Sequence, residues 1–248
     1  MHVSGFARRS ALLAALVLLP VLSGCGSNPF NPPIDPGGDG HIPGDTPEND
    51  SPQNLMIRFE RSYEFQDLPK YELLLTSDFR YTFSAASDPE LVDLYPNWGR
   101  DDEVESTKHL FEGFVNSAGN PIAAASQIDM TLNGIQYNQT DYLHADSTTH
   151  YQKVVVTSVD MDIVVPQSGN DPITYHISAR HEFYIVRGDA AVLDPGQDAS
   201  ANRWYIRRWD DLSPPPPTSA VIRLSAINGA AASPTPVTWG KLKDTFVH

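Results

Sequence analysis

The chain has 248 residues, of which 40% are hydrophobic and 19% are charged, and its net charge is −14. This length allows one domain of ordinary size or two small ones. The acidic excess argues against nucleic acid as a partner because it repels phosphate backbones, and the single cysteine, Cys25, excludes an intrachain disulfide and a site of several thiolates.

The N-terminus has the composition of an export signal. Arg8 and Arg9 are the only charged residues before Cys25, and an apolar run of about 12 residues follows them. A membrane-spanning helix needs roughly 20 such residues. The sequence therefore predicts a signal peptide over residues 1–24, and removing it takes the net charge from −14 to −16.

The signal ends in Leu22-Ser23-Gly24-Cys25, which resembles the lipobox of bacterial lipoproteins. The resemblance implies cleavage before Cys25, a thioether-linked diacylglycerol on its sulfur and acylation, typically by palmitate, of the new amine. Several acyl chains on one residue make membrane anchoring stable. Gly26 is not the Asp that often marks retention at an inner membrane, so the outer membrane is expected if the source is a diderm bacterium.

Residues 25–52 read as the lipidated cysteine followed by a tether. Pro, Gly, Asp and Asn dominate this segment, which cannot bury enough apolar area to offset its ordering entropy. We expect a disordered spacer, partly stiffened by proline, that lifts a globular domain from the membrane surface.

Three helices and one strand are predicted next. Ser51-Pro52 combines a capping hydroxyl with proline at the first helical position. Asp67 begins a second short helix, and Asp101 can cap a third. Between the last two, alternation over residues 79–84 predicts a half-buried strand, and residues 86–100 are expected to form a loop.

Beyond these helices the apolar period changes to two. The alternation predicts four strands, over residues 127–133, 155–165, 173–185 and 204–209. In the second strand, Val155 is expected to share one face with Val159 and Met161. Clean alternation in long strands indicates an antiparallel sheet with one solvated face, and helices gathered on the other face make an α+β layer.

This order of elements resembles the NTF2-like (SnoaL/cystatin-like) α+β roll over roughly residues 53–212. Phe183–Gly188 and Trp204–Trp209 look like the last two strands of such domains, and Trp239–Lys243 looks like a closing element of lipoprotein members. The resemblance implies a curved antiparallel sheet packed on about three N-terminal helices. It also implies a cone with an apolar pocket, and homodimers formed through the sheets.

Residues 213–248 form a Pro-rich connector and a C-terminal extension. Pro214–Pro217 end the last strand, because proline cannot donate a ladder hydrogen bond. This run is either a stiff connector or a polyproline ligand. We expect the extension to dock on the domain through the segment from Trp239 to Phe246.

Five residues are candidates for the pocket, namely Tyr81, Tyr175, His181, Trp204 and Arg208. His181 falls on an apolar strand face, where it is either an acid or base or a core histidine bonded to a backbone carbonyl or a tyrosine. Arg208 is expected to share its face with Trp204 and Ile206. There it either binds a carboxylate or pairs with Asp210.

Three functions remain open. The first is a non-catalytic, membrane-anchored domain that binds a small apolar or amphipathic ligand or a protein. The second is an envelope assembly lipoprotein with an apolar sheet patch centred on Tyr205 and Trp209. The third is an isomerase or dehydratase of the SnoaL or ketosteroid isomerase type, to which Asp78 and His109 could also contribute. No catalytic motif, cofactor or metal site is expected.

Overall fold

The computed structural model describes residues 46–138, 151–214 and 234–247, all within one compact unit, Pro43–His248. The predicted signal peptide, Cys25 and residues 26–45 lie outside the described residues. The predicted tether ends earlier than residue 52, because Asn49 is hydrogen-bonded to the domain. The Asn49 side-chain amide donates to the backbone oxygen of Trp204 at 2.7 Å, and the Trp204 N–H donates to the Asn49 oxygen at 2.8 Å.

The helices are α1 (Pro52–Glu64), α2 (Leu68–Glu72), α3 (Pro89–Leu94), α4 (Arg100–Glu112) and α5 (Trp239–Val247). Ser51 and Asp67 cap α1 and α2 as predicted, because each side chain accepts a backbone N–H three residues on. The third predicted helix, α4, begins earlier than expected. Its cap is Gly99, whose N–H donates to the Asp102 carboxylate at 2.8 Å. Helix α3 lies in the segment predicted as a loop.

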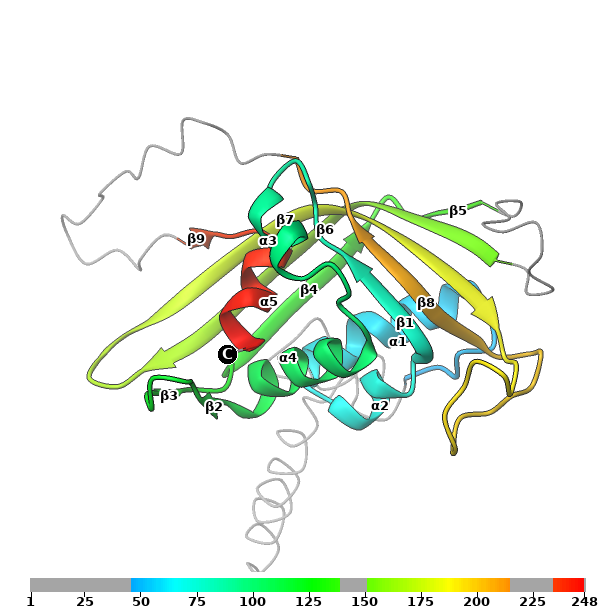
Figure 1. Cartoon of the computed structure of the whole chain (residues 1–248), viewed down its shortest axis with the longest axis horizontal. Coiled ribbons are helices and arrows are strands. Elements are labelled where there is room, and N and C mark those ends of the chain that lie inside the picture. The colour runs from blue at the N-terminus through cyan, green and yellow to red at the C-terminus, as the bar shows by residue number, and fades with distance from the viewer. Residues whose placement is uncertain (1–45, 139–150, 215–233, 248) are drawn as a thin grey trace, which may run out of the picture. The chain divides into compact units, whose positions relative to one another are not determined.

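The main sheet has the strand order β1-β8-β7-β6-β4 (Figure 1). Its strands are β1 (Leu75–Thr82), β4 (Gln127–Asn133), β6 (Tyr151–Gln167), β7 (Asn170–Arg187) and β8 (Trp204–Asp211). The short strands β5 (Gln136–Asn138) and β9 (Thr235–Pro236) pair with β6 and β7, and β2 (Phe114–Val115) and β3 (Pro121–Ile122) form a separate pair.

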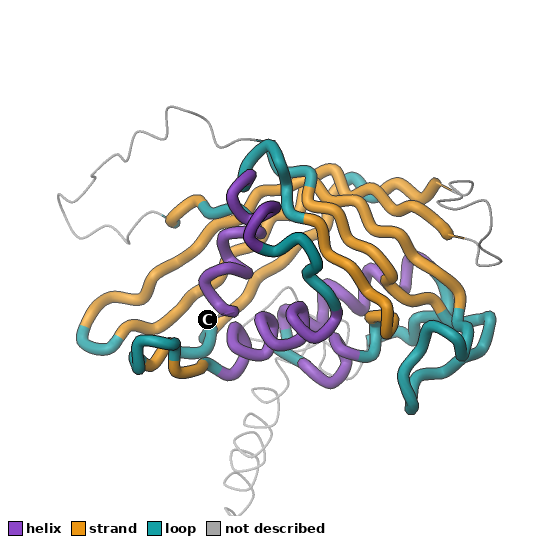
Figure 2. The backbone as a smooth tube through the Cα atoms, viewed as in Figure 1, coloured by secondary structure: helices purple, strands orange, loops and turns teal. Residues whose placement is uncertain are grey.

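The α+β class with a curved sheet packed on helices is confirmed (Figure 2). The sheet is mixed rather than purely antiparallel, because β1 runs parallel to β8 and β9 parallel to β7. All other pairings within it are antiparallel among the described strands.

A bulge in β8 overturns the predicted orientation of Arg208. Tyr184 pairs with Arg208 and Ile185 pairs with Ile206, so Arg207 is an extra residue in β8. One inserted residue exchanges the two faces of the strand beyond it. Ile206 therefore faces the core, whereas Arg208 lies on the outer face with its guanidinium 5.1 Å from the Tyr184 ring.

A second bulge corrects the prediction for Val155. Val156 pairs with His181 and Val159 pairs with Ala179, which leaves one extra residue in β6. Val156 and Val159 both belong to the core as a result. Val155 points to the opposite face, where it lies beside Glu182.

The core lies between the concave face of the sheet and helices α1, α4 and α5. Its largest fully buried side chains include Phe59, Tyr63, Phe183, Trp209, Trp239 and Phe246. The C-terminal extension thus docks on the domain, as expected, through α5. The helical layer contains this C-terminal helix in addition to the N-terminal helices that were predicted.

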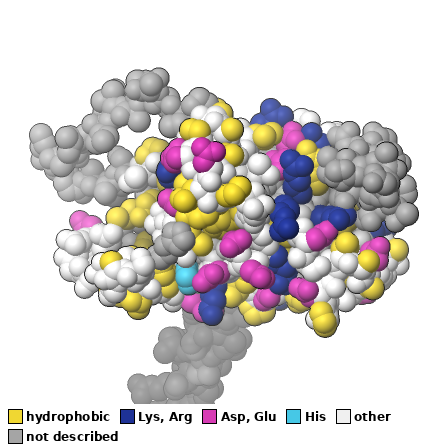
Figure 3. Space-filling view, in the orientation of Figure 1, with side chains coloured by type: hydrophobic (Ala, Val, Ile, Leu, Met, Phe, Trp, Pro, Cys, Tyr) yellow, Lys and Arg dark blue, Asp and Glu magenta, His cyan; other side chains and the backbone are white. Residues whose placement is uncertain are grey.

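The outer face of the sheet is solvated only in part, because Tyr184, Val186 and Tyr205 form a small buried apolar cluster on it. Charged side chains lie beside this cluster. Ion pairs of 2.7 Å join Lys153 to Glu182 and Arg208 to Asp210 on this face. The prediction of an exposed apolar patch around Tyr205 and Trp209 is wrong, because these side chains are only 3% and 0% exposed. On the view of the molecule in Figure 3, Lys and Arg side chains are likewise interspersed with Asp and Glu.

Candidate functional site

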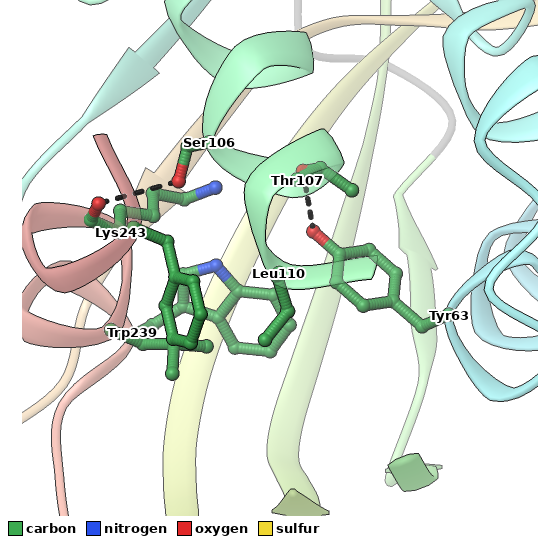
Figure 4. A pocket seen from close by; sticks show the side chains of 8 residues that line it. Tyr63, Ser106, Thr107, Leu110, Trp239 and Lys243 are labelled. Atoms are coloured by element: carbon green, nitrogen blue, oxygen red, sulfur yellow. Dashed lines mark hydrogen bonds between the residues drawn. The ribbon is translucent and has the colours of Figure 1, made fainter. Parts of the chain in front are cut away.

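Helix α5 fills the cone, which we define as the space between the concave sheet face and helices α1 and α4. Trp239, Leu242, Lys243 and Phe246 recur at helical spacing on one side of α5, and none is more than 4% exposed. A cavity of about 10 Å³ lies between α4, α5 and Tyr63, and it is hardly large enough for one water molecule. Figure 4 shows its lining, with Trp239 and Lys243 facing Tyr63 and Ser106.

Glycine 240 lets α5 enter this deeply. A Cβ atom there would lie 2.7 Å from Asp88 Oδ2 and 3.0 Å from Phe83 Cδ1. Only a residue without a side chain allows this close approach. The same Asp88 carboxylate accepts a hydrogen bond from Thr238 Oγ1 at 2.9 Å, which holds the beginning of the helix in place.

A buried ion pair between Lys243 of α5 and Glu103 of α4 occupies the cone. The two side chains are 4% and 0% exposed. Glu103 also accepts hydrogen bonds from Tyr71 Oη at 2.6 Å and Trp98 Nε1 at 2.9 Å. Burial lowers the pKa of the Lys243 ammonium, and the Glu103 charge opposes this shift. The hydrogen bonds from Tyr71 and Trp98 to Glu103 offset part of the cost of burying this pair.

Aromatic rings surround the Lys243 ammonium. Its Nζ lies 4.6 Å from the ring centre of Tyr81 and 4.7 Å from that of Trp209. The rings of Trp98 and Trp239 are 5.9 and 5.8 Å away. Cation–π attraction at these distances offsets part of the cost of burying the charge.

A second buried carboxylate, Asp211, lies at the end of β8. It accepts hydrogen bonds from the backbone N–H and the hydroxyl of Ser213, and from Tyr81 Oη at 3.2 Å. Burial, with the nearby Asp211 charge, raises the pKa of the Tyr81 hydroxyl. Tyr81 therefore remains a protonated donor, and its bond occupies the carboxylate that a catalytic histidine would need.

His181 is fully buried between Trp209 and Trp239, whose ring centres are 5.3 and 5.2 Å away. Its Nδ1 lies 3.8 Å from Asp211 Oδ1, beyond hydrogen-bond distance, and neither ring nitrogen has a hydrogen-bond partner. Burial lowers its pKa to about 4, while the Asp211 charge opposes the shift. His181 is thus a neutral core histidine, and a backbone contact with Asp210 also opposes the lowering of its pKa.

We expect His181 to make stability depend on pH between about 6.5 and 4. The imidazole binds a proton near pH 6.5 when unfolded but only near pH 4 when folded, so its contribution is full above pH 6.5. It is then lost as the pH falls towards 4, by up to roughly 3 kcal/mol. Urea unfolding of the wild type and of His181→Leu across this pH range measures the loss of stability. If the free energy of unfolding changes with pH in the same way in both proteins, the prediction is refuted.

The structure does not bring the other three pocket candidates to His181 and Tyr81. Tyr175 lies six residues before His181 in β7 and pairs with Thr235 of β9. Trp204 begins β8, where its ring lies 4.6 Å from the Arg187 guanidinium. Arg208 lies on the outer face and pairs with Asp210, which was the alternative weighed for it.

Asp78 and His109 lie apart from His181 as well. Asp78 is partly exposed and pairs with Arg207 at 2.5 Å. His109 is half-buried, with Nδ1 2.7 Å from the backbone oxygen of Phe246 and its ring stacked 4.2 Å from Phe114. His109 therefore fastens the end of α5 rather than facing a substrate.

Sequence reasoning missed Glu103 and Lys243, although both occupy recognisable positions. Glu103 precedes Thr107 and Leu110 by four and seven residues, so all three side chains lie on the same side of α4. That side of the helix is buried. Lys243 follows Trp239 by four residues on the apolar side of α5. An isolated charge on a buried helical stripe is the signal that could have identified each of them.

Within residues 46–138, 151–214 and 234–247, no three His, Cys, Asp or Glu side chains gather closely enough to hold a metal ion. None of the helices in these ranges is long and apolar enough to cross a membrane.

No protein-family model matches the chain, and no curated protein matches it significantly. Among solved structures it is similar to a candidate aromatic ring hydroxylase from Novosphingobium aromaticivorans, at 16% identity and a TM-score of 0.42 over 66% of this chain and 87% of that one. It is also similar to an NTF2-like superfamily protein from Salmonella enterica, at 12% identity and a TM-score of 0.38. This match covers 68% of this chain and 91% of that one.

A third similar structure is a ketosteroid isomerase-like protein from Erwinia carotovora atroseptica, at 13% identity and a TM-score of 0.34 over 65% of this chain and 94% of that one. Likenesses at this level carry no argument about activity, because one fold hosts many unrelated functions.

Proposed function

We propose that this protein is a lipoprotein anchored through Cys25, whose domain binds a partner at its surface and does not catalyse a reaction in its cone. The observation that supports this most is the filling of the cone by α5, whose inward side chains are at most 4% exposed and line a cavity of only about 10 Å³. A substrate pocket typically measures hundreds of Å³. The lipobox supports the anchor.

The interior groups are also poorly arranged for proton transfer. A general base must lie about 2.6–3.2 Å from the group with which it exchanges a proton. His181 is fully buried and 3.8 Å from Asp211, and Asp211 is engaged by Tyr81 and Ser213. This arrangement favours binding over the isomerase or dehydratase alternative. Because small apolar molecules have no room in the cone, the partner is a protein or a ligand held at the surface.

Indole is a suitable probe of whether the cone is closed. We expect indole to leave the melting temperature of the full-length wild type unchanged and to raise that of Trp239→Ala. That variant loses a fully buried ring, and an engineered apolar cavity takes up a matching aromatic ligand. Thermal unfolding in the same detergent with and without indole measures both effects.

Phe65→Ala is the control, because Phe65 is 38% exposed and its removal opens no cavity. Indole should leave this variant unchanged. A rise in the melting temperature of the wild type equal to that of Trp239→Ala would mean that the cone is already open, and it would overturn the proposal.

A further inference from the structure

A second cavity, of about 150 Å³, lies where residues 46–51 enter the domain. It is lined by Glu48, Arg58 of α1, Leu73 and Leu74 before β1, Arg203 just before β8, and Tyr205 in β8. Its volume is far above the roughly 10–15 Å³ that one water molecule needs. This cavity is separate from the cone and plays no part in the function proposed above.

Two guanidinium groups in this cavity hold one exposed carboxylate oxygen. Glu48 Oε2 is 3.3 Å from Arg58 and 3.1 Å from Arg203. The arginine side chains are only 14% and 25% exposed, whereas that of Glu48 is 64% exposed. The cations therefore belong to the wall of the cavity, and the anion is a side chain that can leave for solvent.

Each arginine has a further partner besides Glu48. Asp198 accepts from Arg203 Nε at 3.1 Å and from the Ser200 N–H at 2.9 Å. Arg58 donates to the backbone oxygen of Pro47 at 3.3 Å, and its enclosed Nε has no hydrogen-bond partner. Buried donors are normally satisfied, so the Arg58 fork has capacity for a further acceptor.

We propose that this cavity binds a small monocarboxylate and that Glu48 is the intramolecular occupant that the ligand displaces. Without Glu48, the charges of Arg58, Arg203 and Asp198 sum to +1, which matches a monoanion. A guanidinium fork fits the planar carboxylate geometrically. Leu73, which is 41% exposed, is an apolar side chain at the cavity that a short alkyl chain can contact.

The loop that carries Glu48 stays attached when the carboxylate leaves. Asn49 exchanges two hydrogen bonds with the backbone of Trp204, at 2.7 and 2.8 Å. Displacement is therefore a movement of the Glu48 side chain and its immediate backbone, not an unfolding of the segment that precedes α1.

The test titrates the full-length chain with sodium butyrate at constant ionic strength and follows the melting temperature. We expect butyrate to stabilise the wild type. We expect Glu48→Gln to lower the dissociation constant of butyrate roughly two- to fivefold, because the substitution removes one exposed competing carboxylate. Arg203→Gln should abolish the stabilisation. Glu90→Gln is the matched control, since Glu90 is also an exposed partner in an ion pair, with Lys241, and it should titrate like the wild type.

Two comparison probes decide the ligand class. Butyramide has the same shape without the charge and should give no shift, and phosphate should bind more weakly than butyrate. Equal stabilisation by phosphate and butyrate would overturn the carboxylate assignment. Absence of any shift in Glu48→Gln, or the same shift in Arg203→Gln, would overturn the site itself, while leaving the closed cone untouched.

Discussion

Replacing Lys243 by methionine is expected to lower the free energy of unfolding by about 3–5 kcal/mol, the usual cost of breaking a buried ion pair from one side. The substitution keeps most of the apolar stem but removes the ammonium. Glu103, which is 0% exposed, then remains as a buried carboxylate without its counter-charge. The loss of cation–π contacts with Tyr81 and Trp209 acts in the same direction. Urea unfolding measures the change.

The same helix provides a matched control. Lys241 lies two residues away in α5 and forms a 2.6 Å ion pair with Glu90, but these side chains are 40% and 57% exposed. Lys241→Met should therefore cost at most about 1 kcal/mol, as exposed pairs do. If both substitutions lower the free energy of unfolding equally, the buried ion pair does not contribute more to the docking of α5 than the exposed pair does.

The double variant Lys243→Met, Glu103→Gln separates loss of charge balance from loss of packing. Glutamine keeps groups that can bond to Tyr71 and Trp98, whose distances to Glu103 are 2.6 and 2.9 Å. Because no uncompensated charge is then buried, we expect the double variant to be more stable than Lys243→Met alone. Additive losses from the two single variants would contradict this coupling.

Serine at position 25 is expected to move the protein from the membrane fraction to the soluble fraction. A hydroxyl cannot replace the thiolate as the nucleophile that takes up the diacylglycerol, and several acyl chains are what makes anchoring stable. Fractionation of cells expressing Cys25→Ser, together with the intact mass of the product, measures the loss. Ser27→Ala, two residues on, is the control and should stay with the membrane at the lipidated mass. A Cys25→Ser chain that remains in the membrane fraction would refute the anchor.

Local signals in the sequence were enough to place most elements. The hydroxyl and proline of Ser51-Pro52 specify the beginning of α1, because a cap acts on N–H groups within three residues. Alternation of apolar residues located β4, β6, β7 and β8, because the strand period depends only on neighbouring side chains. Helix α3 escaped notice, since six residues are too few to show a helical period.

The candidate site was predictable only in part. Tyr81 and His181 do face the interior, because burial alternates from Phe79 to Thr82 in β1 and from Ile177 to His181 in β7. Arg208 does not, because the extra residue Arg207 in β8 exchanges the faces, and a bulge is specified by the partner strand rather than by β8 alone. Trp209 is buried against Phe59 and Trp239, which are distant in sequence, and Tyr205 packs with Tyr184 and Val186 of β7.

By itself, the sequence determined the α+β class and most of the helices and strands that form it, because these depend on short-range patterns. The export signal with its lipobox is likewise a prediction from a short-range pattern. Only the tertiary structure decided that the cone is filled. Glu103 and Lys243 are 140 residues apart, and no local pattern shows that two such charges will meet in the interior. Their pairing depends on α5 packing against α4, and this packing converts the expected pocket into a closed core.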